Sequence, residues 1–201
     1  MKIKIVADSS ANMLTLDGVD FESAPLKIST DERDFIDDVN LDVEEMANYM
    51  MAYKGKSRSA CPGVGDYLDA FEGYDEVYVV TIISVLSGSY NAAMTAKQQY
   101  EEENPGKKVF VLDSFSTGAE MKLHIEKLRD LILEGKDFET ICEEIQDYKK
   151  NHTALIFCLE SMNNLANNGR VKPAVAKIAS MLGIRAIGDV DEGGLHPTDK
   201  V

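Results

Sequence analysis

Three short apolar runs, each followed at once by a polar turn, constrain the fold of this chain more than any other feature. Residues 3–7, 77–82 and 109–113 have the length of strands, and the run at 77–82 is continuous enough to be buried on both faces. Segments with helical periodicity lie between these runs. This alternation predicts an α/β fold in which an open, mostly parallel sheet is flanked by helices.

The composition sets the size of the fold and the charge of its surface. The 201 residues are 44% apolar and 28% charged, which is typical of a globular chain with one large domain or two small ones. The chain has 21 basic and 35 acidic residues, a formal net charge of −14. Because such a surface repels phosphate backbones and anionic headgroups, we expect neither nucleic-acid binding nor polybasic membrane docking.

The spacing of the cysteines and the length of the apolar runs indicate where in the cell the protein is located. Cys61, Cys142 and Cys158 are far apart and form no C-x-x-C pair, so free thiols in a reducing compartment are expected. The longest mostly apolar run, residues 77–86, is much shorter than the ~20 residues that cross a bilayer. Residues 1–7 become polar too soon for a signal peptide. We therefore expect a cytoplasmic location and no integral membrane segment.

Helices are expected between the strands and in the second half of the chain. One is expected over residues 41–54, one in a short segment after Gly65 and one from the turn at 84–89 to Glu103. A further helix should end at Gly135, and the last should begin near Asp137. Asp42 with Glu45 is a capping box for the first of them.

A domain boundary is expected near residues 149–152, where the helical pattern ends. Beyond it the sequence predicts a strand at 154–159, a helix at 173–182 and a hairpin from 184–190 and 195–198. We divide the chain into an N-terminal α/β domain, 1–151, and the start of a second, smaller, sheet-containing α/β domain, 152–201. The last fifty residues are few for a complete core, so the second domain is expected to be incomplete.

The turns after the three strands carry hydroxyl groups, and in an open α/β sheet such turns form the ligand crevice. The turn at 84–89 carries Ser84, Ser87 and Ser89 around Gly88 and leads into a helix. Hydroxyl and N–H donors at a helix N-terminus favour an anion. A simpler role, in which Ser87 or Ser89 only caps the helix, is about equally favoured.

Two further segments offer donors. Ser59 opens a loop of small residues that runs to Tyr67; taken alone, an ordinary loop with Asp66 as a helix cap is favoured there. Cys61 in that loop has no partner base nearby in sequence, which argues against a nucleophile. Arg170 follows Gly169 and would suit a carboxylate or a phosphate, although a plain surface arginine is the alternative.

Other motifs of catalysis do not occur. The three histidines lie in unrelated segments, and there is no G-x-S-x-G, P-loop or G-x-G-x-x-G motif. Asp8 and Asp113, at strand ends, are favoured as helix caps over general bases. The chain therefore has donors for an anion and no evident catalytic machinery, so we predict a protein that is no enzyme and needs no metal or cofactor.

Five blocks taken together resemble the DegV family of bacterial fatty-acid-binding proteins. The block I-S-V-L-S-G-S-Y-N-A-A at 83–93 is the most specific of them. The others are D-S-S at 8–10, G-D-Y-L-D-A-F at 65–71, V-L-D-S at 111–114 and N-G-R at 168–170. The resemblance extends over essentially the whole chain.

The resemblance implies two domains that hold one long-chain fatty acid between them. The residues that correspond to the family's carboxylate-binding positions are Ser59, Ser87 and Gly88. Arg170 corresponds to an arginine near the carboxylate that is linked to phosphorylation by a partner fatty acid kinase. That kinase converts the bound acid to an acyl phosphate for phospholipid synthesis.

The sequence departs from the family pattern at a few positions. Gly63 stands at a usual serine, Asn168 stands at a usual glycine, and the family's C-terminal histidine stretch has no counterpart in the chain. Two alternatives remain open: an enzyme or sensor that binds the phosphate of a phosphosugar at the serine-rich turn, and a scaffold whose acidic surface docks a basic partner.

Overall fold

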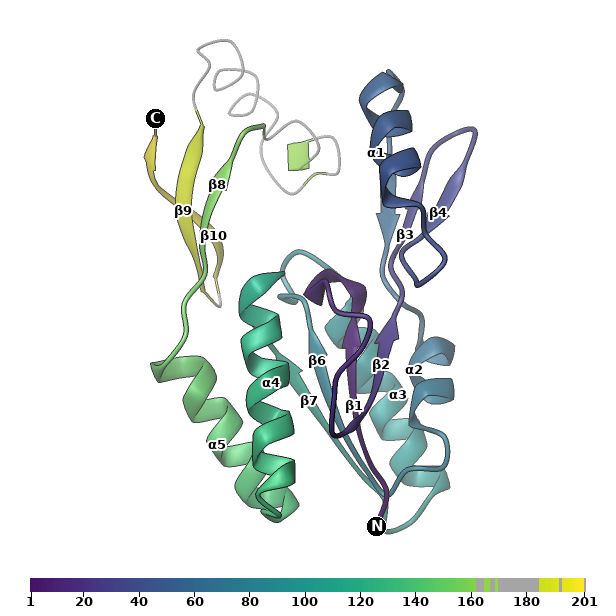
Figure 1. Ribbon diagram of the computed structural model, residues 1–201, viewed down its shortest axis with the longest axis vertical. Coiled ribbons are helices and arrows are strands. Elements are labelled where there is room, and N and C mark those ends of the chain that lie inside the picture. Colours follow the sequence, from purple (N-terminus) through teal and green to yellow (C-terminus); the bar gives the residue numbers. More distant parts are fainter. Residues whose placement is uncertain (162–164, 167–168, 170–184, 192, 201) are drawn as a thin grey trace.

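A four-stranded parallel sheet forms the centre of the molecule. The computed structural model describes residues 1–161, 165–166, 169, 185–191 and 193–200. The strand order of the central sheet is β2-β1-β6-β7, and every neighbouring pair is parallel (Figure 1). Its strands are β1 (Ile3–Asp8), β2 (Asp20–Ala24), β6 (Glu76–Thr81) and β7 (Lys108–Asp113). The three strands predicted from apolar runs are confirmed, and β2 is an edge strand that was not predicted.

Helices cover both faces of this sheet, as the fold class predicts. Figure 1 shows α4 and α5 on one face and α2 and α3 on the other. Their bounds are α2 (Val64–Phe71), α3 (Ser89–Glu103), α4 (Ala119–Leu133) and α5 (Phe138–Asn151). Asp137 begins α5 by accepting a hydrogen bond from the backbone N of Thr140 at 3.0 Å, which is an ordinary N-cap.

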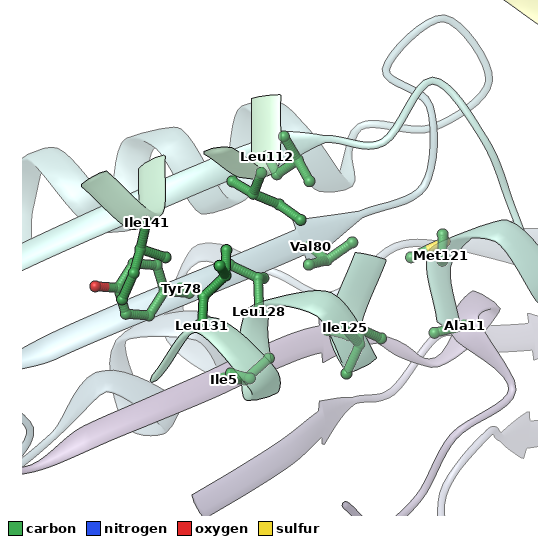
Figure 2. Packing of buried hydrophobic residues seen from close by; sticks show 12 residues of the cluster. Ile5, Ala11, Tyr78, Val80, Leu112, Met121, Ile125, Leu128, Leu131 and Ile141 are labelled. Carbon is green, nitrogen blue, oxygen red and sulfur yellow. The ribbon is translucent and has the colours of Figure 1, made fainter. Parts of the chain in front are cut away.

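The strand side chains alternate between two cores. Ile5, Tyr78 and Val80 pack against α4 and α5, and Figure 2 shows these residues beside Leu128 and Ile141. The residues between them in sequence, among them Val6, Val77 and Val79, pack against α2 and α3. Because both faces are buried, β6 and β7 are apolar throughout their middle residues, 77–80 and 109–112, which is the pattern that made them recognisable. On α4 the buried apolar side chains include Ile125, Leu128 and Leu131, whereas Ile132 is only partly buried.

A small antiparallel sheet and one helix extend from the central sheet. The sheet has the order β4-β3-β5, with strands of three residues each, β3 (Lys27–Ser29), β4 (Asp34–Ile36) and β5 (Arg58–Ala60). Helix α1 (Val43–Ala52) falls within the predicted range 41–54. Asp42 accepts a hydrogen bond from the backbone N of Glu45 at 2.8 Å, as expected for its N-cap. No residue of α1 is buried.

A second antiparallel sheet follows α5. Its order is β10-β9-β8, with β8 (Ile156–Leu159), β9 (Ala186–Asp191) and β10 (Gly194–Lys200), so the predicted hairpin is confirmed. The helix predicted at 173–182 lies outside the described residues. The division into domains 1–151 and 152–201 stays a prediction. No helix among the described residues has the length and apolar character needed to cross a membrane.

Candidate functional site

The turns after β1, β6 and β7 meet at one edge of the sheet and are bonded to one another. The backbone N of Ile83 donates to the carbonyl O of Ser116 at 2.9 Å, and the N of Gly118 donates to the O of Ser10 at 2.9 Å. The N of Ser84 donates to the carboxylate of Asp113 at 3.2 Å. The three polar turns of the sequence therefore form one connected surface, as parallel strands require.

Asp8 is the buried centre of this surface. Its side chain has no exposed area, and its Oδ2 accepts hydrogen bonds from the Oγ of Ser89 at 2.6 Å and from the N of Ile82 at 2.8 Å. Its other oxygen accepts a bond from the Oγ of Ser10. Burial raises the pKa of Asp8, and the hydrogen bonds that converge on it oppose this rise. Asp8 is the N-cap residue of the short 3-10 helix Ser9–Ala11, as predicted in position, but its side chain makes no capping bond to that helix and connects the end of β1 to β6 and α3 instead.

A buried tyrosine extends this network toward α2. The hydroxyl of Tyr67 lies 2.7 Å from the Oγ of Ser89, and both side chains are fully buried. Because the single proton of Ser89 Oγ is donated to Asp8, Tyr67 is the donor in this pair. Burial, together with the nearby Asp8 carboxylate, raises the pKa of Tyr67, which keeps the phenol protonated.

Most of the serine hydroxyls at this edge serve the fold. Ser9 donates to Asp37 Oδ2 at 2.6 Å and accepts from the N of Leu26 at 3.0 Å. Ser114 and Ser116 are buried within their own turn, where the Oγ of Ser114 accepts from the N of Ser116 at 3.0 Å. The expectation that all three turns supply donors for a ligand is therefore too broad, since these hydroxyls are already paired inside the protein.

Ser87 differs from the other serines of the edge. It is half-buried, and its Oγ accepts a hydrogen bond from the N of Ser89 at 3.3 Å. Within the described residues its O–H group donates to no partner, so the proton is available to a ligand oxygen. Gly88 is exposed and is the N-cap residue just before α3, beside the N–H groups of the first helical turn. The helix dipole adds partial positive charge at this point.

The end of β5 lies against this turn. A methyl group on the Cα of Gly88 would be 3.3 Å from the Sγ of Cys61, two residues after Ser59. Ser59 is exposed and lies in β5 opposite Ile28, so the loop predicted there is wrong at this residue. The fold thus brings the segment of Ser59 close to Ser87 and Gly88, although about thirty residues separate them in sequence.

The structure places Asp66 at the start of α2 but does not describe Arg170. Asp66 is not the residue before α2, because the helix begins at Val64, and the Asp66 carboxylate accepts a bond from the N of Gly63 at 2.7 Å. Arg170 lies outside the described residues, so its place relative to the turn stays a prediction. In the part of the chain that the structure describes, no group of three or more His, Cys, Asp or Glu side chains is arranged to hold a metal ion.

The arrangement is chemically suited to an anion with one or two oxygens. Ser87 offers a hydroxyl proton, and the first turn of α3 offers backbone N–H groups. The thiol of Cys61 beside it makes the wall less polar. The site has features that suit carboxylate binding.

Comparison with known proteins identifies the family. Residues 2–201 match the family model described as "Uncharacterised protein, DegV family". A DegV domain-containing protein of Streptococcus pneumoniae strain R6 is 41% identical over 198 residues, which cover 96% of this chain and 70% of that protein.

Solved structures with the same fold contain fatty acids. A DegV family protein from Eubacterium eligens loaded with heptadecanoic acid is 44% identical, with a TM-score of 0.93 over 98% of this chain and 72% of the other. The Fatty Acid Kinase (Fak) B3 protein of Streptococcus pneumoniae, loaded with linoleic acid, is 40% identical, with a TM-score of 0.95 over 100% of this chain and 73% of the other. The chain described here belongs to the DegV family.

Proposed function

We propose that this protein binds one long-chain fatty acid and holds its carboxylate at Ser59, Ser87 and Gly88. The observation that supports the proposal is the close approach of Cys61, just after the end of β5, to Gly88 at the start of α3. The fatty acids in structures that are 44% and 40% identical to this chain support the same ligand class.

The energetics of such a ligand fit a site of this kind. Each CH₂ group removed from water contributes about 0.8 kcal/mol, so a long acyl chain supplies most of the affinity. The carboxylate loses its hydration on binding and must be compensated by donors. The O–H of Ser87 and the first-turn amides of α3 are donors of this type.

The protein acts as a carrier rather than as an enzyme, and it presents the bound carboxylate to a fatty acid kinase that forms an acyl phosphate. The family and the Fak B3 protein among the similar structures support this role. The buried titratable groups beside the turn, Asp8 and Tyr67, are both occupied in holding the fold together. Arg170 is proposed for contact with the head group or the kinase. The three cysteines are free, which fits a reducing compartment such as the cytoplasm.

Replacing Ser87 by alanine tests the head-group site. Loss of one hydroxyl from a charged acceptor is expected to cost about 1.5–3 kcal/mol of binding free energy, or roughly 10- to 150-fold in Kd. The Kd for oleate is measured by displacement of a fluorescent fatty acid, and the free energy of unfolding by urea denaturation. Fold stability should change little, because the bond that Ser87 accepts among the described residues is a long one, 3.3 Å from the N of Ser89.

Thr95→Ala is the matched control, because it removes a hydroxyl that bonds only within α3, to the O of Asn91 at 2.9 Å. Its Kd for oleate should equal that of the wild type. If the Ser87 and Thr95 variants bind oleate with the same Kd, Ser87 does not contact the carboxylate. Thermal stabilisation by sugar phosphates and not by oleate would overturn the ligand class itself.

A further inference from the structure

A cavity lies beside the turn that follows β7. It has a volume of about 480 Å³, which is within the range of small-molecule sites. It is formed by the turn after β7, the start of α4, the end of α5 and the end of β9. The side chains used below are Phe115, Glu120, Lys150, Thr153 and Asp191.

Glu120 is the unusual residue of this cavity. Its side chain is only 8% exposed, yet it lines the cavity, so the little area that it exposes faces the cavity. Within the described residues its carboxylate accepts no hydrogen bond and pairs with no lysine or arginine. Buried carboxylates are normally paired, because a charge that has lost its hydration needs a partner.

The nearest group that could be a cation is the ring of His124, and it does not fill this role. Its Nε2 lies 3.9 Å from Glu120 Oε1, too far for a hydrogen bond, and 3.0 Å from the Oγ1 of Thr153. The Thr153 hydroxyl donates to the O of Lys149 at 3.3 Å, so Nε2 must be the donor to Thr153. The proton of His124 is therefore directed to Thr153 and away from Glu120. Complete burial, with a smaller effect of Lys149, lowers the pKa of His124 to about 4, and the ring is neutral near pH 7.

The two lysines that line the cavity, Lys149 and Lys150, form no ion pair with Glu120 in the part of the chain that the structure describes. The Nζ of Lys149 donates to the O of Asp113 at 3.0 Å and lies 3.6 Å from the centre of the Phe115 ring. Lys150 is exposed at the rim. Asp191 at the rim adds a second carboxylate, which accepts bonds from Gly193 and His196. The interior of the cavity thus has one carboxylate that lacks a donor.

We propose that this cavity binds a small organic cation whose ammonium or guanidinium group donates hydrogen bonds to Glu120. Such a group supplies both the charge and the N–H donors that Glu120 lacks. The proposal does not depend on fatty-acid binding, and the residues that line the cavity do not include Ser59, Ser87 or Gly88.

The test is a calorimetric titration of the whole chain at constant ionic strength. The probes are putrescine, agmatine and L-arginine, and 1,4-butanediol serves as an uncharged analogue of putrescine. At least one cation is expected to bind, whereas the diol is not. Glu120→Gln, which keeps the shape of the side chain, should weaken binding of that cation at least about tenfold, because a charged hydrogen-bond acceptor is lost.

Glu126→Gln is the matched control on α4. That carboxylate is 37% exposed and lies 4.0 Å from Lys122, and its loss should leave the titration unchanged. Thermal unfolding verifies that both variants are folded. The proposal is overturned if none of the three cations binds, if the diol binds as well as putrescine, or if Glu120→Gln weakens binding no more than Glu126→Gln. The fatty-acid content of the same preparation is measured separately, so that failure of the cation proposal can be told apart from failure of the fatty-acid proposal.

Discussion

Replacing Asp8 by alanine is expected to lower the free energy of unfolding by about 3–5 kcal/mol, because the donors around it would remain buried without an acceptor. Those donors are the Oγ of Ser89, the Oγ of Ser10 and the N of Ile82. Since Ser89 begins α3, the start of that helix should also become less ordered. Urea denaturation measures the change in stability, and amide hydrogen exchange of Ile82 reports the local loss of protection.

The matched control is Asp113→Ala, the carboxylate at the end of the next strand. Asp113 is half-buried and accepts bonds from the backbone N of Ser84 and of Phe115, each at 3.2 Å, so its loss should cost only about 1–2 kcal/mol. If the two variants lose the same stability, Asp8 is not the centre of the network.

Acidification is expected to destabilise the protein by up to roughly 3 kcal/mol through His124 alone. The ring has a pKa of about 4 in the folded protein, because it is fully buried, against an ordinary value of 6.5. The unfolded chain therefore binds more protons than the folded protein between these two values, so stability falls as the pH falls from 6.5 to 4. The groups that face the ring are Glu120, Lys149, Thr153 and Tyr148.

His124→Gln should remove this part of the pH dependence. The amide can still donate to Thr153 but takes up no proton in this range. Asp8 acts in the opposite direction, because its raised pKa makes stability fall as the pH rises above 3.8. Both proteins contain Asp8, so the difference between their urea-denaturation curves at pH 4.5 and pH 7 isolates His124. An equal loss of stability in both proteins would contradict the assignment.

The central sheet could be predicted from sequence because its strands are apolar on both faces and its helices carry periodic apolar stripes. The end of α3 at Glu103 and the N-cap Asp137 follow from local chemistry and were both expected. Strands β3, β4 and β5 could not be predicted, because three residues are too few to show an alternating pattern. Strand β2, with Phe21 between acidic neighbours at a sheet edge, has little apolar pattern as well.

The candidate site was predictable in part. A hydroxyl turn before a helix is visible in sequence, but the proximity of Gly88 and Cys61 depends on how β5 pairs with β3, which no local pattern encodes. An aspartate at a strand end resembles a helix cap, so the connecting role of Asp8 was missed. Glu120 was missed because a chain with 35 acidic residues offers no local signal for a carboxylate that, among the described residues, is buried and accepts no hydrogen bond.

The most direct test of the fatty-acid proposal is to purify the protein from bacterial cells, denature it, extract it with organic solvent and analyse the extract by mass spectrometry. The account predicts about one long-chain fatty acid per protein molecule, and a Ser87→Ala preparation should contain less of it. A wild-type preparation that contains no fatty acid, and that also fails to bind added palmitate or oleate, would contradict it.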